Sequence, residues 1–167
     1  MNLELGMESS NGSLGHGLSM AVGISLALKK RNNFESRVFV VMGDGECNEG
    51  SVWEASMSAA HFKLDNLIAI VDYNKLQSDG NSDIVMDIGL LENKWDSFGW
   101  DVISLDGHDI VALNDALIHR GNNMKPKVII AHTTKGKGVS FMENNNTWHH
   151  NRLTQNIYDQ AILELGI

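Results

Sequence analysis

Two apolar segments, each ending in a short polar motif, constrain the fold of this chain more than any other feature. The first ends in Gly43-Asp44-Gly45 and the second ends in Asp72-Tyr73-Asn74. The thirty positions from Asp44 to Asn74 are enough for one strand-helix-strand unit. Parallel strands joined in this way end at the same edge of the sheet, which is where open α/β sheets bind their ligands. The sequence therefore predicts that an acidic oxygen and an amide oxygen meet at that edge.

Apolar patterns typical of strands and of helices alternate along the rest of the chain. We expect strands over 37–42, 67–72, 100–104 and 127–132, helices over 14–30, 50–62, 90–98, 110–120 and 154–165, and loops over 1–12, 75–87 and 133–151. This order predicts an α/β fold, a three-layer sandwich whose mostly parallel sheet is covered by helices on both faces. A length of 167 residues suits a single domain spanning residues 1–167.

Composition narrows the classes of partner. The formal net charge of -8 argues against nonspecific binding of nucleic acid or of anionic membranes. No signal peptide and no apolar run of membrane-spanning length is visible. The single cysteine, Cys47, cannot form an internal disulfide and is consistent with a reducing compartment. We therefore expect a cytoplasmic protein with no nucleic-acid or membrane partner.

The two polar motifs predict a metal-bridged diphosphate site. Asp44 is the expected direct ligand, Asn74 adds a neutral oxygen, and the backbone carbonyl of Leu76 completes the protein's share. Oxygen ligands of this kind suit Mg²⁺, although Ca²⁺ or Mn²⁺ would also fit. Each motif has a simpler reading, since Asp44 could cap the helix beginning near Gly50 and Asn74 could be a turn residue.

Gly43-Asp44-Gly45 together with Asn74 resembles the thiamin-diphosphate motif of the transketolase family. The likeness extends to other blocks, which follow the family's order: 12–17 followed by 20–23, 43–50 with Trp53-Glu54, 106–109 and 133–138, with Trp148-His149 after them. The resemblance is nearest to the diphosphate-binding, N-terminal subunit of transketolases that are split between two polypeptides. It also implies that this chain is truncated, because the family's domain begins roughly a hundred residues earlier.

The resemblance implies a role for each matching residue. The aminopyrimidine or thiazolium of thiamin diphosphate would be lined by Gly12, Ser13 and Leu14. Mg²⁺ would be held by Asp44, Asn74 and the Leu76 carbonyl, and the diphosphate would be touched by Gly45 and Asn74. His149 would lie beside the cofactor and the substrate as the catalytic residue. Glu49 and Glu54 would lie at the interface with a partner. When the resemblance is set aside, simpler interpretations fit equally well. His149 and His150 would then be a solvated pair in a loop, and Glu49 and Glu54 would lie on a solvated helix face. Lys135 and Lys137 would belong to a flexible turn or would flank a phosphate.

The implied activity is transfer of a two-carbon ketol unit between sugar phosphates in carbohydrate metabolism. In the family, the pyrimidine-binding domain supplies the glutamate that activates the cofactor, and we expect that domain to lie on another chain. We therefore expect a homo- or hetero-oligomer that needs a pyrimidine-binding or C-terminal transketolase subunit for activity. Two alternatives stay open. One is another thiamin-diphosphate enzyme, such as a 2-oxo acid decarboxylase or a dehydrogenase component. The other is a catalytically inert, truncated interaction subunit.

Overall fold

A computed structural model describes residues 2–119, 121 and 124–167 of the chain. Its main sheet has four strands in the order β1-β2-β6-β5, all parallel. The strands are β1 (Val38–Gly43), β2 (Leu67–Tyr73), β5 (Asp101–Asp106) and β6 (Lys127–His132). The order places β1 and β5 at the two outer edges, with β2 and β6 buried between them. The predicted parallel α/β fold is confirmed.

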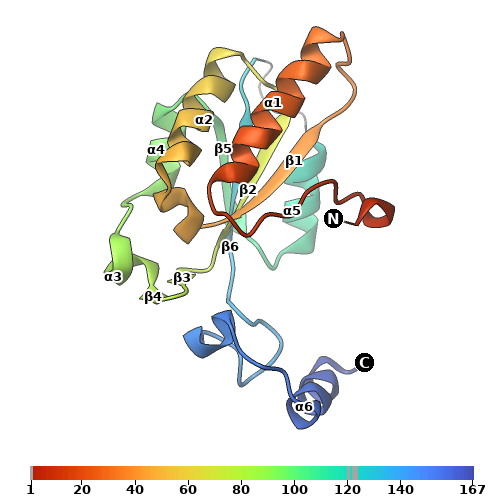
Figure 1. Ribbon diagram of the computed structural model, residues 1–167, viewed down its shortest axis with the longest axis vertical. Coiled ribbons are helices and arrows are strands. Elements are labelled where there is room, and N and C mark those ends of the chain that lie inside the picture. Colours follow the sequence, from red (N-terminus) through yellow and green to blue (C-terminus); the bar gives the residue numbers. More distant parts are fainter. Residues whose placement is uncertain (1, 120, 122–123) are drawn as a thin grey trace.

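Helices cover both faces of this sheet, as Figure 1 shows. On one face lie α1 (His16–Lys30), α2 (Gly50–His61) and α4 (Leu91–Ser97), and on the other lies α5 (Ile110–Ile118). The last helix, α6 (Gln155–Leu165), lies apart from the sheet, beyond the edge where β6 ends. Helix α5 ends at Ile118, so it is shorter than the helix predicted over 110–120. The last residue of that prediction, Arg120, lies outside the described residues. Within the described part of the chain, no helix combines the length and the apolar character needed to cross a membrane.

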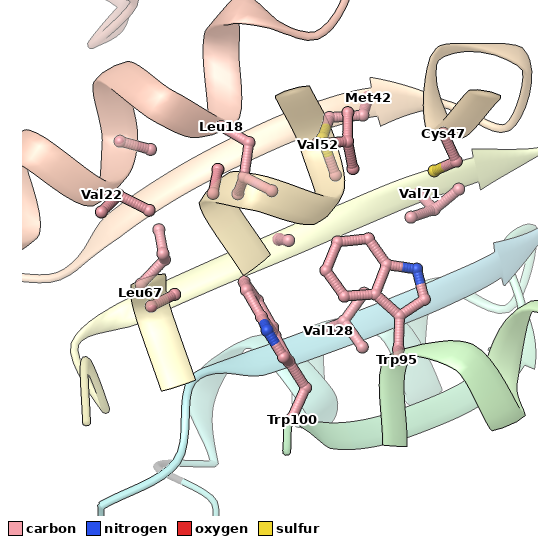
Figure 2. Packing of buried hydrophobic residues seen from close by; sticks show 14 of the residues in the cluster. Leu18, Val22, Met42, Cys47, Val52, Leu67, Val71, Trp95, Trp100 and Val128 are labelled. Atoms are coloured by element: carbon pink, nitrogen blue, oxygen red, sulfur yellow. The ribbon is translucent and has the colours of Figure 1, made fainter. Parts of the chain in front are cut away.

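The larger core lies between the sheet and the three helices α1, α2 and α4 (Figure 2). Trp95 and Trp100 are both completely buried there, and their rings meet edge to face with centroids 4.7 Å apart. The indole N–H of Trp100 donates to the backbone oxygen of Ser56 at 3.1 Å, so the buried ring has a polar partner as well as apolar neighbours. These contacts fix β5 and α4 against α2.

The first long helix differs from its prediction. It begins at His16 rather than at Leu14, because Gly15 has a left-handed backbone (φ 81°) that cannot continue a right-handed helix. Leu14 and Ile24 are also about half exposed, so α1 is buried along one side only and is not buried all round.

Two segments predicted to be loops contain short regular elements. The 75–87 segment forms a hairpin of β3 (Leu76–Gln77) and β4 (Gly80–Asn81), followed by α3 (Ser82–Met86). Asn81 caps α3 by accepting from the backbone N–H of Asp83 at 2.9 Å. Single-turn helices also occur at Leu3–Leu5 and Asn146–His149, inside the other predicted loops.

Candidate functional site

The parallel register brings three strand ends level with one another. Gly43 of β1 pairs with Asp72 of β2, which pairs in turn with Ala131 of β6. The backbone N–H of Asp44 donates to the backbone oxygen of Asp72 at 3.2 Å, so the ladder continues one residue past β1. Asp44 and Asn74 therefore leave neighbouring strands at the same carboxyl edge of the sheet, as the sequence predicts.

Asp44 is a buried carboxylate, with only 3% of its surface exposed. Burial raises the pKa of this carboxyl group, and the negative charge of Asp72 acts in the same direction. Hydrogen bonds from the Ser82 hydroxyl, 2.7 Å from Oδ2, and from the backbone N–H of Gly45 offset part of that cost. The simpler reading of Asp44 as a helix cap is wrong: the side chain makes no cap bond, and the N-cap of α2 is Glu49.

The side-chain amide of Asn74 has one orientation, because its nitrogen and its oxygen each have a hydrogen-bond partner. Its Nδ2 donates to Oδ2 of Asp72 at 3.0 Å, and its Oδ1 accepts from the backbone N–H of Leu76 at 3.0 Å. The second bond makes Asn74 a turn residue, as its simpler reading predicts. The two readings are compatible, because a carbonyl oxygen has two lone pairs and Oδ1 can still face a cation.

The oxygens predicted as ligands are of the kind that a hard divalent cation prefers. Asp44 supplies a carboxylate, Asn74 an amide oxygen and Leu76 a backbone carbonyl, which is a set typical of Mg²⁺ sites that a phosphate completes. Among the described residues, no cluster of three or more His, Cys, Asp and Glu side chains could hold a metal ion. A cation at this edge would therefore depend on one carboxylate and on neutral oxygens. It would also relieve the unfavourable burial of Asp44.

Asp72 joins the three strand ends through its side chain and backbone. Its carboxylate accepts from the Thr133 hydroxyl and from Asn74, while its backbone oxygen accepts from Asp44. No role for Asp72 was predicted from the sequence, although it lies in the Asp72-Tyr73-Asn74 motif. Partners of this kind orient metal ligands.

Replacing Asp72 by asparagine should lower the Mg²⁺-dependent affinity for thiamin diphosphate about tenfold, since loss of a ligand's orienting partner typically costs between 10- and 100-fold. An amide at position 72 presents N–H groups to one of its two donors. Thr133→Val removes one of those donors and should act in the same direction with a smaller effect. Titration calorimetry of both variants measures the change, and wild-type affinity in both would show that Asp72 orients nothing.

Gly45 has an internal reason to be glycine. A Cβ at this position would lie 2.7 Å from Cγ of Gln77, at the end of β3. The predicted contact of Gly45 with a diphosphate therefore remains a prediction, because a side chain here would already displace Gln77.

The Gly12–Leu14 loop precedes α1 and is exposed at all three residues. A Cβ at Gly12 would meet nothing within 4 Å, so the loop is open on that side. Gly15, at its end, is buried and bonded to Glu46 and Ser51, which lie just after the Asp44 motif. The structure thus brings the two predicted cofactor loops together. Sequence reasoning missed Glu46 and Ser51, as it missed Ser82 and Thr133.

His149 is exposed and ends the single-turn helix Asn146–His149. Asn146 donates from Nδ2 to the backbone oxygen of Ser78 at 2.9 Å, which ties this turn to the β3–β4 hairpin that carries Leu76. The role of His149 beside the cofactor remains a prediction. The preceding loop carries Lys137, which lies 3.7 Å from Oε1 of Glu143.

Glu49 and Glu54 are both exposed in the single chain, so their predicted place at a partner interface remains a prediction. Cys47 is completely buried in the larger core. Burial, with the nearby charges of Asp44 and Glu46, raises the pKa of its thiol to about 12. Cys47 is therefore a neutral, small apolar residue in the turn that follows Asp44.

Comparison with known proteins identifies the family. The family model described as the transketolase thiamine diphosphate binding domain matches residues 1–167. The chain belongs to the transketolase family. Among solved structures, transketolase from Campylobacter jejuni superposes with a TM-score of 0.88 at 32% identity, covering 97% of this chain and 26% of that one.

Curated relatives of this transketolase-family chain include proteins that are named as transketolase subunits. One of the subunits of the apulose-4-phosphate transketolase of Phocaeicola vulgatus is 43% identical over 96% of this chain and 57% of its own length. The 6-deoxy-6-sulfo-D-fructose transketolase subunit SqwG of a Clostridium species is 40% identical over 99% of this chain and 60% of its own length. The chain thus spans somewhat more than half the length of these relatives.

Proposed function

We propose that this chain binds thiamin diphosphate with a divalent cation, Mg²⁺ by preference, and serves as the diphosphate-binding subunit of a ketol transferase. The observation that carries the proposal is the buried carboxylate of Asp44, which follows β1 at the same carboxyl edge of the parallel sheet where Asn74 follows β2. The chain's membership of a thiamine diphosphate binding family supports the choice of cofactor.

Each residue of the site has a defined task in this proposal. Asp44, Asn74 and the Leu76 carbonyl hold the cation, and Gly45 and Asn74 contact the diphosphate. Gly12, Ser13 and Leu14 line the ring end of the cofactor. His149 holds or moves a proton at a substrate hydroxyl, which an imidazole can do near neutral pH. When bound, thiamin diphosphate supplies carbanion stabilisation, which the side chains of this protein cannot provide.

The proposed reaction transfers a two-carbon ketol unit from a ketose phosphate to an aldose phosphate. Two relatives are named for apulose-4-phosphate and for 6-deoxy-6-sulfo-D-fructose, and both are ketoses. A ketose that carries an anionic group at its far end is therefore the donor class we propose. Because both relatives are named as subunits, we propose that catalysis also needs a companion pyrimidine-binding subunit.

Titration calorimetry of the full chain with thiamin diphosphate tests the binding. We expect saturable binding in Mg²⁺, its loss when EDTA removes the cation, and its recovery with Mn²⁺ or Ca²⁺. A folded chain that binds nothing, even with the companion subunit present, would support the inert alternative.

A coupled ketol-transfer assay, run with and without the companion subunit, tests the reaction. Turnover is expected only when both chains are present. Turnover by the isolated chain would contradict its dependence on a partner, and decarboxylation of 2-oxo acids in place of ketol transfer would contradict the substrate class.

A further inference from the structure

The backbone N–H and the backbone carbonyl of Gly15 are both hydrogen-bonded to side chains from elsewhere in the chain. Its N–H donates to Oε1 of Glu46 at 2.8 Å, and its carbonyl oxygen accepts from the Ser51 hydroxyl at 3.1 Å. Glu46 lies in the single turn Gly45–Asn48 directly after Asp44, and Ser51 lies in the first turn of α2. The start of α1 is therefore bonded to the segment that follows the candidate metal ligand.

Packing around Gly15 leaves no freedom at this point. The residue is buried, and a Cβ on it would lie 2.4 Å from Oγ of Ser51 and 2.8 Å from Cβ of Glu49. Its backbone is left-handed, a conformation that residues with side chains rarely adopt. The Gly12–Leu14 loop is thus anchored at one end and open at the other.

The hydrogen bond that Glu46 accepts from the Gly15 N–H is charge-assisted and half-buried. A carboxylate that accepts from a backbone N–H makes a shorter and stronger bond than a neutral acceptor. Glu46 follows Asp44 by two residues and reaches across 31 positions to Gly15. One short segment therefore carries a candidate metal ligand and also sets the position of the Gly12–Leu14 loop.

We propose that Glu46 is a positioning residue which, together with Ser51, fixes the Gly12–Leu14 loop relative to Asp44 so that both ends of the cofactor are met at once. The inference rests on the proposed function, because it gives that loop the ring end of thiamin diphosphate and gives Asp44 the diphosphate end. A ligand that reaches both ends depends on this bond. Magnesium pyrophosphate reaches only the Asp44 end, so its binding does not depend on the bond between Glu46 and Gly15.

The test compares two probes by titration calorimetry: thiamin diphosphate with Mg²⁺, and inorganic pyrophosphate with Mg²⁺. Glu46→Ala and Ser51→Ala should each weaken binding of thiamin diphosphate about tenfold, which is typical for loss of a part-buried hydrogen bond. Both variants should bind magnesium pyrophosphate within about twofold of wild type. Glu46→Gln keeps an oxygen that can accept from Gly15 and should restore most of the affinity for thiamin diphosphate.

Ser58→Ala is the matched control for Ser51, because the Ser58 hydroxyl donates to the backbone oxygen of Glu54 within the same helix. It should leave both probes unchanged. Equal weakening of both probes by Glu46→Ala would overturn the positioning role, and so would wild-type affinity for both. A loss of pyrophosphate affinity in Glu46→Gln would show that Glu46 acts through its charge instead.

Hydrogen exchange in the ligand-free chain separates this inference from the proposed function. Glu46→Ala should speed exchange of the Gly15 amide and leave that of Leu113, in α5, unchanged. An unchanged Gly15 amide would overturn the inference whatever the chain binds. If wild type binds neither probe while its Gly15 amide is protected, the proposed function has failed although the bond itself exists.

Discussion

Replacing Asp44 by asparagine is expected to weaken Mg²⁺-dependent binding of thiamin diphosphate about 100-fold or more, without destabilising the ligand-free chain. The loss follows from charge, because removing one partner of a buried ion pair typically costs about 3 kcal/mol or more. Stability should respond in the opposite direction. The carboxylate is 3% exposed and its pKa is raised by burial, so its ionised form opposes folding when no cation is present.

The stability effect of Asp44→Asn should depend on pH. Because the pKa of Asp44 is higher in the folded chain than in the unfolded chain, its favourable contribution is complete below the unfolded pKa. That contribution is lost as the pH rises through the folded pKa. Asparagine does not titrate, so the variant should be more stable than wild type at pH 7 and should lose this advantage below about pH 4.

Urea denaturation at the two pH values measures that difference, and titration calorimetry measures the binding. Asp115→Asn is the control, since Asp115 is exposed on α5 at the opposite face of the sheet. It should change neither quantity. Wild-type cofactor affinity in Asp44→Asn would remove Asp44 from the proposed site. A large loss of stability at pH 7 would show that Asp44 is structural and does not oppose folding.

The two central strands of the sheet were predictable from the sequence because they are nearly continuous apolar runs. The 127–132 strand has the predicted bounds, and the 67–72 strand extends by one residue. Both are central and buried on both faces, so local composition alone identifies them. The hairpin β3–β4 and helix α3 were missed for the opposite reason. They are short and polar, and a bond between Ser82 and Asp44 that spans 38 positions ties them to the sheet.

Sequence reasoning also found the candidate ligands of the site more readily than their supports. Asp44 and Asn74 end apolar strands in short motifs, so their place at one edge followed from the topology of a parallel sheet. Glu46, Asp72 and Ser82 act through hydrogen bonds whose partners depend on how loops pack. Nothing in the local pattern marks Glu46 as the partner of Gly15, because the two meet only when α1 and α2 lie side by side.

Replacing Trp100 by alanine is expected to be the most damaging core substitution that we consider, with a loss of about 4 kcal/mol in the free energy of unfolding. The ring is completely buried, packs against Trp95 and donates to the backbone oxygen of Ser56. Alanine would leave a large cavity between α4, β5 and α2, and would also remove the hydrogen bond from the indole N–H to the Ser56 oxygen. Domains of this size have a total stability of only about 5–15 kcal/mol.

Two further variants separate the reasons for that loss. Trp100→Phe keeps most of the apolar contact but removes the N–H donor, and should cost about half as much. Trp148→Ala removes a half-exposed tryptophan from the Asn146–His149 turn, where it contacts Phe141, and should cost much less than Trp100→Ala. Urea denaturation followed by far-ultraviolet circular dichroism compares all three without relying on tryptophan emission. Equal losses for Trp100→Ala and Trp148→Ala would contradict the placement of Trp100 at the centre of the larger core.

Since α2 carries Ser51 and packs directly on α1, a weakened core on that face should also reduce the affinity for thiamin diphosphate at temperatures where the chain is still mostly folded.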